Sequence, residues 1–185
     1  MLLNALNLVI VLSLPFCILA ANPLVSEGKG EDVVCDTIAK IKQSGIFADD
    51  ANIMRRIAYA ESLFGTHPNT YRSGYNGGIW QVDKIGFEDA KDIQSHPNLG
   101  KLWSKIEILL NKQRNNIKWE DLRKPLFSGV FARIRLYLVP SAIPSDINGQ
   151  AAYWKKYYNS AAGAGTVAGF VNKVNDMNNK FGSTC

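Results

Sequence analysis

The segment Ile53-Met-Arg-Arg-Ile-Ala-Tyr-Ala-Glu-Ser-Leu-Phe-Gly65 carries the periodicity that decides the fold class. Apolar residues recur in it every three or four positions, which places them on one face of an α-helix. That face consists of Ile53, Ile57, Ala60 and Phe64. Asp49 and Asp50 precede the segment as candidate N-caps, and Gly65 is a typical helix breaker. The segment is therefore predicted to be an amphipathic helix.

Helical spacing extends over most of the remaining chain. The predicted helical segments are residues 32–45, 84–92, 99–110, 119–122, 126–138, 150–158 and 167–177. Residues 66–78 are rich in turn formers, and residues 79–83 are expected to form a short strand or an extended segment. We expect a mostly α fold of the α+β type.

The N-terminal segment, residues 1–21, has the layout of a signal peptide. It contains no charged side chain, and its apolar run ends in Ala20 and Ala21. Pro15 interrupts the run, which is also short for a bilayer span. We therefore expect a cleaved leader and a secreted, extracellular protein with no membrane contact in its mature form. A buried N-terminal helix or an uncleaved anchor is the alternative.

The remaining chain has the length of one domain, about 160 residues. Residues 22–31 contain proline, serine and glycine and are expected to be a flexible lead-in. Residues 32–185 contain no repeat and are expected to form a single domain and a monomer. The formal net charge of +5 suits an anionic surface such as a bacterial wall. The basic residues are scattered rather than clustered with aromatics, which argues against nucleic acid as a partner.

Two cysteines, Cys35 and Cys185, remain after the leader is removed. In an oxidising compartment they are expected to form one disulfide that ties the C-terminus to the first helix. Two free thiols are the alternative. His67 and His96 are the only histidines in the chain, which leaves little material for a zinc site or a cysteine nucleophile. We therefore expect no metal and no cofactor.

Glu61 continues the apolar stripe of the 53–65 helix near its end. A carboxyl in that position is partly removed from water, which penalises its charged form and raises its pKa. A general acid that works near neutral pH needs this property. The alternative is a carboxylate that emerges at the rim of the stripe and has no chemical role.

Glu61-Ser62, the turn-rich loop and Gly78-Ile-Trp-Gln-Val-Asp83 resemble the catalytic stretch of goose-type lysozymes and soluble lytic transglycosylases. The resemblance covers about 25 residues and implies that residues 32–185 are a catalytic domain of lysozyme-like fold with Glu61 as the catalytic acid. In that fold a helical lobe and a small hairpin or irregular lobe, here residues 66–83, flank a cleft. It also implies that Ser62 and Gln81 contact the substrate and that Asp83 is the second carboxylate. Glycosidases commonly use such a pair of carboxyl groups.

The chain departs from the goose-type pattern in one respect, because residues 66–78 contain no Asp or Glu. Asp83 would then activate water alone, or the substrate's own 6-hydroxyl would replace water as in a lytic transglycosylase. Asp83 could instead cap the helix that begins at Lys84. The segment 157–165 resembles a Tyr-Asn-Ala-Gly turn that borders the same cleft, which makes Tyr158 a candidate substrate contact. Tyr75 is a second candidate, since aromatic rings offer rigid faces to sugars.

The resemblance implies cleavage of the β-1,4 bond between N-acetylmuramic acid and N-acetylglucosamine in peptidoglycan. Chitin or chitosaccharides are the alternative substrates, since related folds act on both. A secreted glycan-binding protein that keeps the cleft without turnover is the non-enzymatic alternative.

Overall fold

The structure, a computed structural model, describes residues 22–160 and 163–185, and this part of the chain contains helices and turns but no strand. The leader predicted at residues 1–21 lies outside these residues. The α-helices are α1 (Glu31–Gln43), α2 (Ile53–Ser62), α3 (Lys84–Lys91), α4 (Leu99–Leu110), α5 (Pro125–Leu138), α6 (Ile147–Tyr153) and α7 (Val167–Phe181). The short helices are η1 (Arg114–Asn116), η2 (Trp119–Arg123) and η3 (Trp154–Asn159), of which η3 is a π-helix.

The mostly α fold class is confirmed. Residues 79–83 do not form the short strand that we expected, and the segment 66–83 is irregular, which was the alternative to a hairpin. Residues 78–81 form turns, and Gln81 has a left-handed backbone with φ of 50°. The amide of Gln81 bonds to the carbonyl of Gly78, and the amide of Val82 bonds to that of Gly77. The Trp80 amide bonds to the Ser128 hydroxyl on α5. The backbone groups of this segment are therefore satisfied by turns and a side chain rather than by a partner strand.

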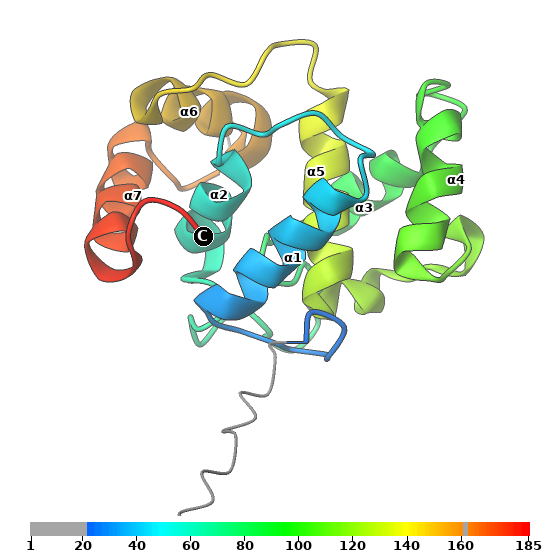
Figure 1. Cartoon of the computed structure of the whole chain (residues 1–185), viewed down its shortest axis with the longest axis horizontal. Helices are drawn as coiled ribbons and strands as arrows, with labels where there is room; N and C mark the ends of the chain where they lie inside the picture. Colours follow the sequence, from blue (N-terminus) through cyan, green and yellow to red (C-terminus); the bar gives the residue numbers. More distant parts are fainter. Residues whose placement is uncertain (1–21, 161–162) are drawn as a thin grey trace, which may run out of the picture.

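Helix α5 lies at the centre of the molecule, with α1 and α2 on one side of it and α3 and α4 on the other (Figure 1). Residues 125–134 of this helix are all buried. Most of these residues are apolar, and a helix with apolar residues on nearly all sides is stable only inside a core, which explains this position. None of the helices in the described residues is long and apolar enough to cross a bilayer.

Gly129 allows α1 and α5 to approach closely, and this contact supports a stability prediction. A Cβ atom at Gly129 would lie 2.7 Å from the Thr37 side chain and 3.2 Å from the Trp80 ring. We expect Gly129→Ala to lower the free energy of unfolding by about 1 kcal/mol, because overpacking outweighs the gain in helix propensity.

The matched control is Gly100→Ala on α4, where an added Cβ meets no atom within 4 Å. This change should stabilise the protein by up to about 1 kcal/mol. Urea unfolding of both variants measures the difference. A Gly129→Ala variant as stable as Gly100→Ala would contradict the close contact.

Helix α2 begins as predicted but ends earlier. The Asp50 carboxylate accepts hydrogen bonds from the amides of Asn52 and Met54, which caps the helix start. The helix ends at Ser62, because Leu63, Phe64 and Gly65 all have left-handed backbones. Consecutive left-handed residues are strained and are typical of segments that the surrounding structure holds in place. Glu61 therefore lies directly before a sharp change of chain direction.

The predicted disulfide between Cys35 and Cys185 is present, with the two Cα atoms 5.4 Å apart. It holds the chain end that follows α7 against α1. The fully buried Arg55 strengthens this attachment, because its guanidinium donates to the carbonyl of Gly182 and pairs with Glu31 at 2.6 Å. Helix α7 consequently packs along α2, which carries Glu61.

The lead-in, residues 22–31, contacts the helices, and its flexibility stays a prediction. The Pro23 carbonyl accepts a hydrogen bond from the Leu126 amide, and Glu27 forms an ion pair with Arg123 at 2.6 Å. The Gly30 amide bonds to the carbonyl of Phe64. These contacts attach the lead-in to the rest of the protein. Helix α1 begins directly afterwards, at Glu31.

Candidate functional site

Glu61 lies near the end of α2 and is partly buried. Its carboxylate oxygen Oε1 accepts a hydrogen bond of 2.8 Å from Nε1 of Trp154. Trp154 begins the π-helix η3, directly after α6. Local π-helical turns occur frequently at functional sites, because the wider turn redirects side chains. The structure thus brings together two residues that are 93 positions apart in the sequence.

The electrostatic environment of Glu61 favours its neutral form. Burial raises the pKa of the Glu61 carboxyl above its ordinary value. The hydrogen bond from Trp154 and the positive charges of Lys173 and Arg135 offset part of this increase. The net direction agrees with the sequence-based expectation for this residue, and a carboxyl that keeps its proton closer to neutral pH is suited to general acid chemistry.

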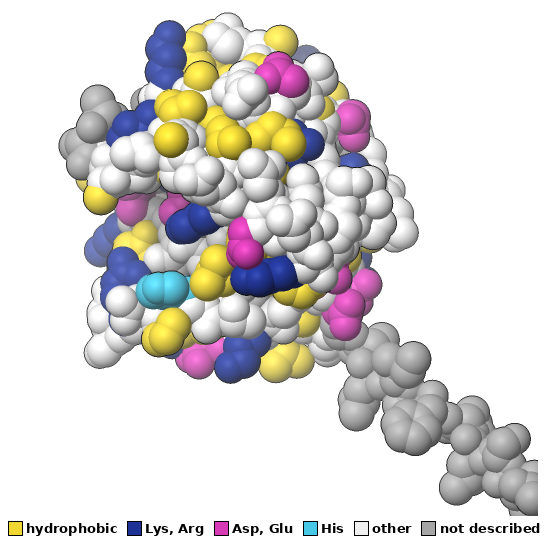
Figure 2. Space-filling view, turned by 90° about the vertical axis from the view of Figure 1, so that its left-hand side faces the viewer, with side chains coloured by type: hydrophobic (Ala, Val, Ile, Leu, Met, Phe, Trp, Pro, Cys, Tyr) yellow, Lys and Arg dark blue, Asp and Glu magenta, His cyan; other side chains and the backbone are white. Residues whose placement is uncertain are grey.

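A cavity of about 210 Å³ opens beside Glu61, between α2, η3 and α7. Its lining consists of Ala60, Glu61, Trp154, Asn159, Gly165, Thr166, Gly169, Phe170 and Lys173. The lining combines polar side chains such as Asn159 and Lys173 with the aromatic rings of Trp154 and Phe170, a mixture that suits a sugar better than a purely apolar ligand. On the side of the molecule that bears α6 and α7, basic and acidic side chains are interspersed (Figure 2).

The charges of Glu61 and Asp83 both influence two buried tyrosines, Tyr75 and Tyr158. Burial, with smaller contributions from Asp83 and Glu61, raises the pKa of Tyr75 to about 12. Burial also raises the pKa of Tyr158 well above its ordinary value, and both carboxylates add to that increase. Asp83 and Glu61 therefore lie close enough to the same two phenols to influence them. Both phenols stay protonated at neutral pH and act there as hydrogen-bond donors.

The two tyrosines predicted to contact substrate use their hydroxyl groups inside the protein. The Tyr158 hydroxyl donates to the carbonyl of Trp80 at 2.7 Å, and its side chain is buried. The Tyr75 hydroxyl donates to the carbonyl of Gln81 at 2.8 Å, and the Arg72 guanidinium lies 3.7 Å from the Tyr75 ring centre. The Tyr158 bond attaches the 66–83 loop to η3, whereas the Tyr75 contacts lie within that loop. Substrate contact by either tyrosine stays a prediction.

Ser62 and Gln81 likewise have structural partners in place of a free polar group. The buried Ser62 hydroxyl donates to the carbonyl of Ala58 and accepts from the Gly65 amide, which stabilises the end of α2. The Gln81 side-chain amide donates to the carbonyls of Thr70 and Gly78. Gln81 has a left-handed backbone, so it does not lie in an extended segment. Substrate contact by Ser62 or Gln81 stays a prediction.

Asp83 caps α3, which is the structural alternative considered from the sequence. Its Oδ1 accepts a hydrogen bond of 2.6 Å from the Gly86 amide. Asp83 is also exposed to solvent. The cap orients one carboxylate oxygen toward the helix N-terminus, where it satisfies an otherwise unpaired amide. A role for Asp83 as the base stays a prediction, and this geometry provides no support for it.

Three contributors to the site have no sequence signal that links them to Glu61: Trp154, Lys173 and Arg135. The Lys173 ammonium donates a hydrogen bond to the carbonyl of Ala60, next to the acid. The Arg135 guanidinium lies 4.7 Å from the Tyr158 ring centre and also acts on the Glu61 charge. The resemblance of residues 157–165 to a turn that borders the cleft was the sequence feature that indicated a site near Trp154.

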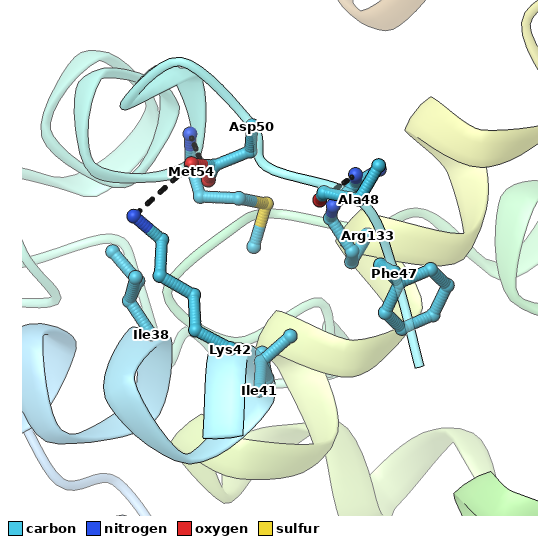
Figure 3. A pocket seen from close by; sticks show the side chains of 8 residues that line it. All are labelled: Ile38, Ile41, Lys42, Phe47, Ala48, Asp50, Met54 and Arg133. Atoms are coloured by element: carbon cyan, nitrogen blue, oxygen red, sulfur yellow. Dashed lines mark hydrogen bonds and ion pairs between the residues drawn. The ribbon is translucent and has the colours of Figure 1, made fainter. Parts of the chain in front are cut away.

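A second pocket lies between α1, the loop that precedes α2, and α5 (Figure 3). Its free space is about 10 Å³, room for one water molecule at most. Lys42 pairs with Asp50 at 3.6 Å across its mouth, and Arg133 donates to the carbonyl of Ala48. This pocket is a satisfied polar junction within the core. The described residues also contain no group of three or more potential metal ligands.

No family model matches the sequence, and neither a curated protein nor a solved structure matches it.

Proposed function

We propose that the protein is a secreted glycosidase of lysozyme-like fold that cleaves the β-1,4 bond between N-acetylmuramic acid and N-acetylglucosamine in peptidoglycan. Glu61 is the general acid. The main support for this proposal is the Glu61 carboxyl. It is partly buried, its pKa is raised, and it borders a cavity of about 210 Å³. The resemblance of residues 61–83 to goose-type lysozymes and lytic transglycosylases supports the substrate class, and the net charge of +5 suits an anionic wall.

The reaction begins when neutral Glu61 transfers its proton to the bridging oxygen as the bond to the anomeric carbon breaks. The resulting Glu61 carboxylate then removes a proton from the attacking hydroxyl as that oxygen bonds to the anomeric carbon. Because Asp83 is used as a helix cap, we assign both proton transfers to Glu61. The attacking group is then the 6-hydroxyl of the muramic acid residue, and the product is an anhydro-sugar.

Product analysis of purified peptidoglycan by mass spectrometry tests this proposal. Anhydro-muramic ends support transglycosylation, whereas reducing ends identify water as the nucleophile and keep the glycosidase assignment. Release of chitosaccharides from chitin without any release from peptidoglycan would show that the substrate is chitin and not peptidoglycan. If neither polymer is cleaved but glycan is still bound, the protein is a glycan-binding protein and not an enzyme.

Asp83→Asn tests the number of carboxylates that the reaction uses. Asparagine is also a good helix cap, so we expect the fold to be retained and turnover to fall by no more than about tenfold through lost positioning. Initial rates of wall digestion measure the effect. A fall of more than about 100-fold in a folded variant would identify Asp83 as the base.

The matched control is Asp146→Asn, because Asp146 caps α6 by the same bond to the amide of Gly149. Both variants make the same chemical change at a helix N-terminus. Equal, small effects of the two variants would support a purely capping role for Asp83. A large effect confined to Asp83→Asn would contradict the single-carboxylate assignment.

A further inference from the structure

Trp154 has one polar group, and that group is directed at Glu61. The indole Nε1–H donates to Oε1 of Glu61 at 2.8 Å. The Trp154 side chain is buried, and its ring lies against Phe170 with the ring centres 4.9 Å apart. On another side a Cβ atom at Gly165 would lie 2.3 Å from the ring, so only glycine fits there. The ring is therefore held by contacts that do not depend on Glu61.

The chemistry of this hydrogen bond distinguishes the two oxygens of the carboxyl group. An indole N–H can only donate, and a protonated carboxyl has one O–H group and one carbonyl oxygen. The carbonyl oxygen is the better acceptor, so the hydrogen bond to Oε1 leaves the proton of neutral Glu61 on Oε2. The same bond also stops the carboxyl group from rotating.

We propose that Trp154 is a positioning residue that selects Oε2 of Glu61 as the oxygen that carries and transfers the catalytic proton. This inference rests on the proposed role of Glu61 as the acid. Trp154 itself does not exchange a proton, since the indole N–H does not titrate in the physiological range. Its contribution is the orientation of the acid before the substrate is bound.

The hydrogen bond has a second consequence that can be measured separately. A donor to a carboxylate favours the charged form, and for Glu61 this lowers the pKa against the larger effect of burial. Removal of the donor should therefore raise the Glu61 pKa further. Since a general acid loses activity as pH rises through its pKa, the alkaline limb of the pH–rate profile should move to higher pH.

The test is Trp154→Phe, which keeps an aromatic ring against Phe170 and removes the N–H donor. The matched control is Trp103→Phe, because Trp103 is equally buried and also donates a single hydrogen bond, to the carbonyl of Ala90. Two measurements are made on both variants: the pH–rate profile of wall digestion and an NMR titration of the Glu61 carboxyl carbon. The titration does not require any activity.

We expect Trp154→Phe to lower kcat about tenfold or more, since misorientation of a catalytic group is costly. The alkaline limb and the Glu61 pKa should both move upward. Trp103→Phe should lose a similar amount of stability and change neither. An unchanged pKa and kcat in a folded Trp154→Phe variant would overturn the inference. If the Glu61 pKa moves upward in Trp154→Phe but the wild type shows no Glu61-dependent cleavage, the proposed function fails while the hydrogen bond's effect on Glu61 stands.

Discussion

Glu61→Gln should abolish cleavage of peptidoglycan while leaving the fold intact. The amide has nearly the same shape, and its oxygen can still accept the hydrogen bond from Trp154. It cannot transfer a proton, and loss of a general acid costs a factor of about 10² to 10⁴ in rate. Turnover of purified peptidoglycan, compared with the wild type at equal protein concentration, measures the loss. Retention of more than about a tenth of the activity would exclude Glu61 as the acid.

The stability of this variant is a second readout with a defined sign. A carboxyl whose pKa is raised on folding holds its proton more tightly in the folded state. The stability that this provides is present at low pH and is lost as pH rises through the folded pKa. Glu61→Gln should therefore be as stable as the wild type at neutral pH, or more stable. Glu88→Gln, at an exposed position on α3, is the control and should change neither activity nor stability.

Removal of the disulfide should produce the largest loss of stability. Cys35 and Cys185 are separated by 150 positions, so the bond closes nearly the whole described chain into a loop. In the chain-entropy description such a bond contributes on the order of 4 kcal/mol. For a domain of this size that corresponds to a fall in Tm of roughly 10 °C. Calorimetry of the Cys35→Ser, Cys185→Ser double variant measures it.

Each single serine variant should be destabilised as much as the double variant, because either one removes the bond. Intact-mass analysis of the wild type should show two fewer hydrogens than the reduced protein, and alkylation without reductant should label neither cysteine. A double variant with unchanged Tm would contradict a stabilising bond. Wild-type cysteines that label readily would show that the bond is absent in solution.

The helices were predictable because their signals are local. Apolar spacing in residues 53–65 or 126–138 needs only neighbouring turns of one helix, and the structure places α2 and α5 there. The segment 79–83 was not predictable in the same way. Its alternation of side chains suits a strand, but a strand needs a partner, and here Ser128 and the turn residues take the backbone bonds instead.

In the candidate site, too, the features with a local sequence signal were predictable and those that depend on tertiary partners were not. The position of Glu61 at the end of an apolar stripe was readable from helical geometry, and burial of its carboxyl follows from that position. The roles expected for Ser62 and Gln81 came from a motif in which side-chain partners are not visible. In the structure the Ser62 hydroxyl and the Gln81 side-chain amide both form hydrogen bonds with nearby backbone groups. The sharp turns in this region leave backbone groups that need such partners.

The sequence alone determined three features: the mostly helical class, the carboxyl group of Glu61 near the end of a helix, and the cysteine pair. Each of them depends on spacing or on a count of residues. Only the tertiary structure decided which groups surround that acid. Trp154 and Lys173 lie on η3 and α7, more than 90 positions from Glu61, and no local pattern relates them to it. They meet because α7, tied to α1 by the disulfide, packs along α2 and completes the cavity beside Glu61.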